Sequence, residues 1–482
     1  MNLNLVSKLD KNEETRRRFS LNCICPDDGK YIKTSENLAK YLSSGAEWLA
    51  CAKVQRVLLE TRVEFGKADK KHLEELDAIM EKLDPLNMSL IESLVTKHDQ
   101  LAVIEEIGRF VSDETKALLH PGTTSYDILD TGRSYLFKSC WYESLRPEVS
   151  KSIITLCDLS EMSKNLLQVG RTHLQNTSPV PLELTLSIYA RRLAERMKKC
   201  DISFDDLKGK ISGMVGTGAG IEMVIGEGTS LDFELAVLNK LGLKPDYSAT
   251  QVVQKEGLSD VGHGLVSLMH VLSDFANDIR LMYSSAIGEV TSRDNAERLG
   301  GSSADAMKNN PINWENIGGT ESLLEGGMRS LYFMIKSDFQ RDLRSSKPAR
   351  YQPQMMMTEI YESFLRLNKT LEELSFNEDV LGKNLIPIKE NPSEAMVAIL
   401  RGEGWVHPKY GGGHDFVKEM GKKSKRESRR LLGVCLEDNE FKILYEKLSE
   451  NKRFILSGQI HRYIGSSVER AKLNREYCRN SI

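Results

Sequence analysis

The chain has 482 residues, 40% of them hydrophobic and 28% charged, an ordinary composition for a globular protein of two or three domains or lobes. Its net charge of −3 gives no polyanion-binding signature, so nucleic acid is not an expected partner. Eight cysteines without a CxxC pair, no apolar leader and no run of roughly 18 apolar residues predict a cytoplasmic protein with free thiols and no membrane span.

Helical periodicity dominates the sequence, and three long helical patterns stand out. They cover residues 135–166, 182–197 and 258–282, where apolar residues recur three and four positions apart. Helices of this length usually belong to a helical bundle, because an isolated long helix has too few neighbours to bury its apolar face. We therefore predict an all-α fold of three helical domains, with the central long-helix bundle in the middle one: residues 1–116, 117–373 and 374–482.

Turn-forming residues separate these patterns and mark the segments where chemistry is expected. They fall at residues 120–122, 170–181, 213–220 and 300–311. Residues 402–413, which end in three consecutive glycines, are predicted to form a long loop whose role the sequence does not indicate. The basic clusters at residues 16–18 and 422–430 are interpreted as solvated helix faces.

Three of the nine histidines lie in polar, turn-forming contexts and are candidates for proton transfer: His98, His120 and His173. Taken singly, each is better interpreted as a partly buried histidine held by a neighbouring hydroxyl or carboxylate. His263 and His270 lie on a periodic helix and receive the same interpretation. No zinc site is predicted, because neither HExxH nor paired Cys/His spacing occurs.

The glycine-rich segment at residues 300–311 carries hydroxyl, ammonium and amide groups, and such a loop is able to close over an anion. It lacks the spacing of a phosphate-binding GxxxxGK[ST] loop, and residues 216–220 do not form GxGxxG. Nucleoside-triphosphate and dinucleotide folds are therefore not favoured. By itself the segment is equally compatible with a flexible surface connection.

Taken together in chain order, these motifs resemble the fumarase and aspartase superfamily and, within it, the adenylosuccinate lyase branch. The superfamily loop signature GSSxMPxKxNP is matched by residues 301–311, and Asn316 continues it as in that branch. The resemblance covers about residues 28–350. The other markers, in chain order, are Asp28-Gly29-Lys30-Tyr31, Lys97-His98-Asp99, His120 with Thr124, Ser125 and Asp127, His173 with Gln175, residues 211–217, Gln251, Arg341-Asp342-Leu343, Ser346 and Arg350.

The resemblance implies a β-elimination that cleaves adenylosuccinate to AMP and fumarate, and also acts on the succinyl-carboxamide ribotide of purine biosynthesis. It implies that His173 protonates the departing nitrogen and that Ser302 removes the proton from the succinyl carbon. It also implies a homotetramer whose active sites each draw residues from three chains. Neither a metal nor an organic cofactor, and neither nucleic acid nor a membrane, is implied.

The remaining site residues are implied to bind the substrate, which carries two carboxylates and a phosphate. Lys308 and Asn310 would stabilise the carbanion intermediate. The succinyl carboxylates would be held by His98, Thr124 and Ser125, with His120 and Gln251 close by. The nucleotide phosphate would be held by Lys30, Tyr31, Arg341, Ser346 and Arg350, and Lys97, Asp99 and Asn316 complete the expected binding set.

The sequence departs from the family pattern in the loop itself. Asp305 and Ala306 stand in place of Met-Pro, which removes a fixed φ and adds a negative charge near a polyanionic substrate. Lys30 and Lys255 stand where the family usually has arginine. Two alternatives therefore stay open: a sister lyase that releases fumarate from another succinyl amine, and a catalytically impaired helical scaffold.

Overall fold

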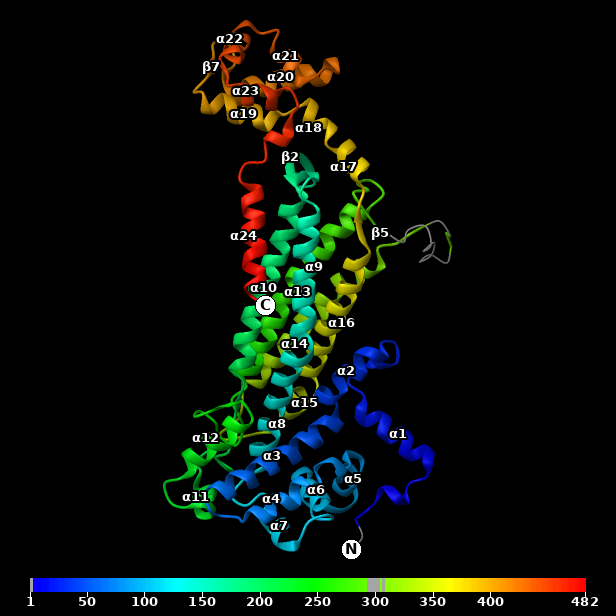
Figure 1. Cartoon of the computed structure of the whole chain (residues 1–482), viewed down its shortest axis with the longest axis vertical. Helices are drawn as coiled ribbons and strands as arrows, with labels where there is room; N and C mark the ends of the chain where they lie inside the picture. Colours follow the sequence, from blue (N-terminus) through cyan, green and yellow to red (C-terminus); the bar gives the residue numbers. More distant parts are fainter. Residues whose placement is uncertain (1–2, 293–303, 306–307) are drawn as a thin grey trace. The chain divides into compact units, whose positions relative to one another are not determined.

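The computed structural model describes residues 3–292, 304–305 and 308–482, and most of these residues are helical (Figure 1). The chain divides into two compact units, each built from three segments. The first unit contains Met1–Val149, Arg196–His270 and Gly319–Leu365, and the second contains Ser150–Glu195, Val271–Gly318 and Arg366–Ile482. The three predicted domain ranges are a different division and stay a prediction.

Five long helices contribute residues to both units. They are α9 (Arg146–Met162), α10 (Leu182–Asp205), α13 (Glu256–Tyr283), α14 (Ile312–Met334) and α16 (Gln352–Glu373). In the first unit, Arg196 of α10 donates to Ser267 of α13, and Ser259 of α13 donates to a main-chain oxygen of α14. In the second, Phe275 of α13 packs edge-on against Trp314 of α14, with ring centroids 5.7 Å apart. The predicted bundle of long helices is confirmed, and α10 and α13 match their patterns.

The first long pattern is only partly a helix. It begins inside α8 (Ser125–Cys140), passes through a π-helical turn, η5 (Trp141–Leu145), and continues as α9, which ends at Met162. Pro147 lies two residues after the end of the π-turn and has no N–H to give to the helical ladder, which is a common reason for such a local widening. The prediction that the pattern reaches Leu166 is wrong, because the chain has turned toward a strand by then.

Helices α3 (Ser44–Glu64) and α8 pack closely at the centre of the first unit. A Cβ at Gly132 of α8 would stand 3.5 Å from the Ala50 side chain of α3, so both positions need small residues. Arg133 of α8 forms two hydrogen bonds with Glu47 of α3, at 2.7 and 3.0 Å. Val54, Leu58, Ile128 and Phe233 belong to the buried core around this contact.

The other elements of the first unit are short and surround α3 and α8. They are η1 (Val6–Lys8), α1 (Lys11–Asn22), η2 (Pro26–Gly29), α2 (Ile32–Leu42), α4 (Lys70–Asp77), η3 (Met80–Lys82), α5 (Pro85–Ile91), η4 (Glu92–Thr96), α6 (Asp99–Ile107), α7 (Asp113–Ala117), β3 (Lys208–Gly209), α11 (Ala219–Ile225), α12 (Ser230–Lys240), β4 (Lys244–Pro245) and α15 (Ser346–Ala349). The strands β3 and β4 pair in parallel.

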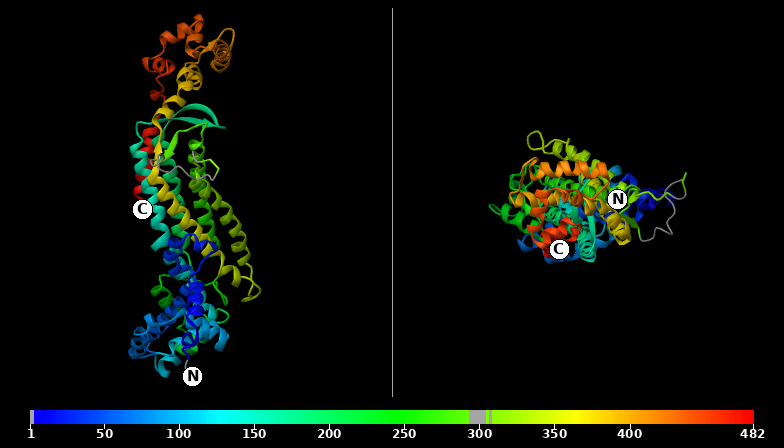
Figure 2. Two further views of the ribbon diagram at one scale, coloured as in Figure 1. Left: turned by 90° about the vertical axis from the view of Figure 1, so that its right-hand side faces the viewer. Right: turned by 90° about the horizontal axis from the view of Figure 1, so that it is seen from above.

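A β-hairpin in the second unit replaces the turn expected at residues 170–181. Its antiparallel strands are β1 (Leu167–Thr172) and β2 (Gln175–Pro181), seen as two long arrows in Figure 2. Within the described residues there are four such two-stranded sheets, so the strictly all-α prediction is corrected to a mostly helical fold. The hairpin was missed because its two-residue turn lacks the Asn-Gly or Asp-Gly pair that usually signals one.

Short helices near the C-terminus form a separate core in the second unit (Figures 1 and 2). The predicted loop at residues 402–413 is anchored to it, because the buried His407 stacks on Phe416 and accepts from the main-chain nitrogens of Lys409 and Tyr410. The elements here are β5 (Val290–Ser292), β6 (Leu374–Phe376), α17 (Glu378–Asn384), α18 (Ile386–Glu390), α19 (Ser393–Gly402), β7 (Val406–His407), β8 (Gly411–Gly412), α20 (Gly413–Glu427), α21 (Leu431–Cys435), α22 (Asn439–Lys447), α23 (Glu450–Leu456), η6 (Ile460–Arg462) and α24 (Ser467–Arg479). Among the described residues, none of the helices has the length and apolar character needed to cross a bilayer.

Candidate active site

His98 caps the N-terminus of α6 in the first unit and contacts a hydroxyl of the next predicted motif. Its Nε2 lies 3.2 Å from Ser125 Oγ, and its Nδ1 lies 3.3 Å from the carboxylate of Asp99. The preceding residue, Lys97, has a φ of 54°, which is uncommon for a residue with a side chain, and its ammonium turns back to the carbonyl oxygen of Ser93. The backbone therefore bends sharply at Lys97 and presents His98 to Ser125.

His120 is half-buried beside a glutamine and a threonine. Its Nδ1 lies 2.9 Å from Gln55 Nε2 and 3.0 Å from Thr123 Oγ1. Burial lowers the pKa of His120 to about 4, and the charges of His98 and Arg62 act in the same direction. At neutral pH this histidine is uncharged and keeps one ring N–H, and its backbone is held at a strained φ of 71°.

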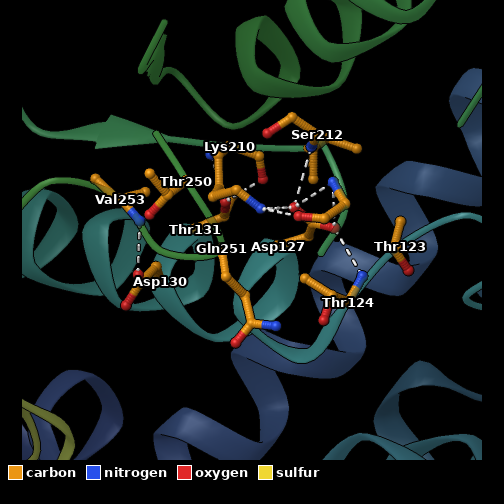
Figure 3. Close-up of polar contacts among 12 residues, drawn as sticks. Thr123, Thr124, Asp127, Asp130, Thr131, Lys210, Ser212, Thr250, Gln251 and Val253 are labelled. Carbon is orange, nitrogen blue, oxygen red and sulfur yellow. Dashed lines mark hydrogen bonds and ion pairs between the residues drawn. The ribbon is translucent and has the colours of Figure 1, made fainter. Parts of the chain in front are cut away.

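Thr124 and Ser125 are positioned by a capping box at the start of α8 (Figure 3). Thr124 is the N-cap, and its main-chain nitrogen donates to Asp127 Oδ2 at 2.7 Å. Asp127 also accepts from the main-chain nitrogens of Ser212 and Gly213, at 3.1 to 3.2 Å, and pairs with the ammonium of Lys210. Both charged side chains are fully buried, so this pair anchors the predicted segment after residue 211 to the first turn of α8.

Arg341, Ser346 and Gln251 meet around Tyr126, which follows Ser125 in the chain. The Arg341 guanidinium lies over the Tyr126 ring, 4.0 Å from its centroid, and donates to Gln251 Oε1 at 2.7 Å. The Tyr126 hydroxyl lies 2.7 Å from Ser346 Oγ. One aromatic side chain thus brings three of the predicted residues together. Tyr126 and Ser346 lie more than 200 positions apart along the chain.

Arg350 and His98 both influence the pKa of the same carboxyl group, that of Glu92. Burial and the charge of Asp99 raise the pKa of Glu92, while Arg350 and then His98 oppose the rise. Arg350 itself is exposed and forms no ion pair with any residue that the structure describes. It is therefore available to an external anion. Lys30 lies against its neighbour Tyr31 at the start of α2, 5.3 Å from the ring centroid.

The remaining predicted residues belong to the second unit. His173 is exposed in the turn of the β1–β2 hairpin, where His173 and Leu174 have φ angles of 52° and 58° between the paired residues Thr172 and Gln175. Lys308 and Asn316 are exposed, and Asn310 is half-buried. Ser302 lies outside the described residues.

Lys255 has a structural role that the sequence did not indicate. Its ammonium donates to Asp130 Oδ2 at 2.7 Å. The same oxygen accepts from the main-chain nitrogen of Val253 at 3.0 Å (Figure 3). Both charged side chains are buried. The lysine that departs from the family pattern thus forms a buried ion pair and holds the chain segment next to Gln251 in place.

Sequence reasoning missed Tyr126, Gln55 and Lys210. Tyr126 stands between two residues of a recognised motif, so its position was a usable signal. Gln55 and Lys210 lie in ordinary sequence and gain their roles only through tertiary contacts with His120 and Asp127. A group with metal-ligand chemistry also occurs among the described residues: the ligand atoms of His270, Glu321 and Glu325 lie within 4.8 Å of one another, and none belongs to the site above.

The chain is similar to known proteins in sequence and in fold. A protein-family model described as "Lyase" matches residues 31–322. The chain is 27% identical to the adenylosuccinate lyase of Methanocaldococcus jannaschii over 80% of this chain and 83% of that protein. It is 30% identical to the adenylosuccinate lyase of Bacillus subtilis over 53% and 57%.

Two solved structures share the fold at low sequence identity. The 3-carboxy-cis,cis-muconate lactonizing enzyme of Pseudomonas putida has a TM-score of 0.76 at 16% identity, covering 96% of this chain and 99% of its own. The fumarate lyase of Mesorhizobium sp. BNC1 has a TM-score of 0.76 at 18% identity, covering 92% and 97%. At these identities the likeness describes the fold alone.

Proposed function

Because the chain belongs to the lyase family whose model matches residues 31–322, we propose that this enzyme cleaves adenylosuccinate to AMP and fumarate. The observation that carries the proposal is the grouping around residues 124–126. Ser125 contacts His98 on one side, and Tyr126 contacts Arg341 and Ser346 on the other. A substrate with two carboxylates and a phosphate needs both kinds of partner within one site. The curated relatives from M. jannaschii and B. subtilis carry the same activity in their names.

The proposed reaction is a β-elimination that conserves all atoms of the substrate. Ser302 takes the proton from the succinyl carbon next to the carboxylate, the C–N bond breaks, and His173 protonates the nitrogen of the purine as fumarate forms. A serine hydroxyl is a weak base in water, so Lys308 and Asn310 would stabilise its alkoxide and the dianionic intermediate. The step needs protons alone, and neither a metal nor an organic cofactor is required by its chemistry.

The histidines of the first unit are proposed to bind substrate, each in a different way. His98 and Ser125 would hold one succinyl carboxylate with Thr124, and neutral His120 would donate a ring N–H to the other. Gln251 would contribute beside Arg341, whose guanidinium is already oriented by the Tyr126 ring. Action on the succinyl-carboxamide ribotide is part of the proposal, because that substrate presents the same two carboxylates and phosphate.

Self-association as a homotetramer is also proposed, with each site completed by residues of three chains. The location of His173 and of residues 308–316 in one unit and of His98 and Ser125 in the other is compatible with such sharing. A cytoplasmic location belongs to the proposal as well, since all eight cysteines are free thiols, as expected in a reducing compartment.

A substrate panel tests the proposed activity. Purified protein should release fumarate from adenylosuccinate and should leave argininosuccinate and simple N-succinyl amines unchanged, because these lack the phosphate that Arg341, Ser346 and Arg350 would bind. Fumarate is followed by absorbance and the second product by chromatography. Turnover of another succinyl amine with none of adenylosuccinate would instead support the sister lyase.

Replacing Arg350 with alanine is expected to raise KM for adenylosuccinate about 10- to 100-fold, with a smaller change in kcat. A hydrogen bond to a charged group contributes about 1.5–3 kcal/mol, which corresponds to that range. The matched control is Lys347→Ala, which removes an exposed positive charge three positions earlier. With N-succinyladenosine, which lacks the phosphate, the two variants should behave alike. An Arg350→Ala defect that persists with the nucleoside would remove the phosphate assignment.

A further inference from the structure

A groove in the second unit is lined by basic side chains that the proposed reaction does not use. It lies along α18, α19 and α20 and has a volume of about 1210 Å³. Only Glu390 and Glu394 contribute carboxylates to its lining. The basic residues that line it are Arg401, His414, Lys418, Lys422, Lys425, Arg429 and Arg430.

Helix α20 presents one continuous basic face to this groove. His414, Lys418, Lys422 and Lys425 follow one another at intervals of four, four and three residues, so they share a face of the helix. The opposite face carries Phe416 and Met420, which are buried in the core of the C-terminal helices. This packing fixes the direction of the basic face. The interpretation of residues 422–430 as a solvated helix face agrees with the exposure of Lys422 and Lys425, although α20 ends at Glu427 and this exposed face also lines a groove.

Three of the cations have no carboxylate partner among the residues that the structure describes: Arg401, Lys418 and Lys425. Lys422, by contrast, is paired with Glu419 at 2.6 Å, and Arg429 with Glu427 and Glu437. The two carboxylates of the lining are also engaged. Glu394 accepts from Ser178 Oγ at 3.0 Å, and Glu390 lies 3.8 Å from Arg430. The groove therefore has an uncompensated positive charge, which attracts anions.

Small side chains contribute to the lining of the groove. Ala398, Gly421 and Ser424 contribute to it, and a Cβ added at Gly421 would meet nothing within 4 Å. Ile388 and Val417 line the groove but are buried, so they offer little apolar surface to a ligand. The lining contains no Phe, Tyr or Trp side chain on which a base or an apolar anchor of a peptide could stack. These features favour a compact, highly charged ligand over a docking peptide.

We propose that this groove is a binding site for a small polyphosphorylated anion. Arg401 and the lysines of α20 supply the charge-assisted hydrogen bonds that several phosphate groups require, and the volume of about 1210 Å³ leaves room for several such groups. Asn176 and Thr177 of β2 also line the groove, only a few residues beyond the turn that carries His173. A bound anion would thus touch the hairpin of the proposed general acid, and in this respect the inference rests on the proposed function.

Titration of the full-length protein with inorganic tripolyphosphate, followed by calorimetry at fixed ionic strength, tests the site directly. We expect one binding event, weakened at least about tenfold by each of Arg401→Ala, Lys418→Ala and Lys425→Ala. The matched control removes three exposed lysines of the same unit that lie outside the groove, in the variant Lys383→Ala/Lys442→Ala/Lys447→Ala. That variant loses three positive charges, more than any single groove variant, and should still bind tripolyphosphate almost normally.

Two further variants separate this site from the active site. Gly421→Leu adds a side chain in open space on a helix and should block binding without changing the charge. Arg350→Ala should leave tripolyphosphate binding unchanged. Because binding is measured without substrate, the outcome does not depend on whether the chain cleaves adenylosuccinate. The proposal is overturned if the triple lysine control weakens binding as much as the groove variants, if Arg350→Ala abolishes it, or if a hexaglutamate peptide binds as tightly.

Discussion

The variant His173→Asn is expected to lower kcat for adenylosuccinate cleavage about 10²- to 10⁴-fold, the usual contribution of a general acid. Asparagine is chosen because it tolerates the left-handed conformation that His173 adopts, with a φ of 52°. The hairpin should therefore fold as before, and the loss should reflect chemistry. Steady-state fumarate release measures the rate, and circular dichroism checks that helix content is kept.

The control for this variant is Leu174→Asn, which changes the other left-handed residue of the same turn and leaves the imidazole in place. It should retain most of the activity. A second check uses a substrate whose leaving nitrogen has a lower pKa: the defect of His173→Asn should then shrink, because less protonation is needed. Equal activity of His173→Asn and Leu174→Asn on adenylosuccinate would rule out His173 as the acid.

The variant Lys210→Met is expected to destabilise the protein by about 3–5 kcal/mol, the usual effect of removing one partner of a buried ion pair. Methionine matches the length of lysine but leaves the carboxylate of Asp127 buried without its cation. Urea denaturation followed by circular dichroism measures the loss. Activity should fall as well, because Asp127 orients Thr124 at the start of α8.

The matched control is Lys244→Met, which removes an exposed lysine paired with Asp206 at 2.6 Å in the same unit. Exposed pairs of this kind contribute under about 1 kcal/mol, so the unfolding midpoint should scarcely move. The double variant Lys210→Met/Asp127→Asn should recover part of the stability, since it leaves no unpaired charge. If Lys210→Met were as stable as Lys244→Met, the anchoring role of this pair would be wrong.

The long helices could be predicted from sequence because their signal is local. In α13, apolar residues recur every three or four positions over about seven turns, and the structure has a helix at Glu256–Tyr283. The same rule failed near Pro147, where the period continues through a π-turn that no apolar pattern distinguishes from an α-helix. It also failed at residues 167–181, where pairing between two strands, rather than any turn signature, decides the structure.

The candidate site was accessible to sequence reasoning only as separate motifs. His98 and Ser125 were each suspected from their neighbours in the chain, but their 3.2 Å contact depends on how α6 and α8 fold together. The neutral state of His120 depends on its burial, which brings it beside Gln55, a residue 65 positions away with no motif of its own. The groove along α20 is a similar case, because the basic residues of α20 line a groove only when α19 packs beside that helix.

The measurement that tests the account most directly is the release of fumarate from adenylosuccinate by the wild-type protein and by Ser302→Ala. We predict that the wild type releases fumarate and AMP in equal amounts and that Ser302→Ala, although folded, is at least about 100-fold slower, as expected when the base of a proton transfer is lost. Absence of turnover by well-folded wild-type protein would contradict the proposed activity, and an undiminished rate in Ser302→Ala would contradict the proposed base.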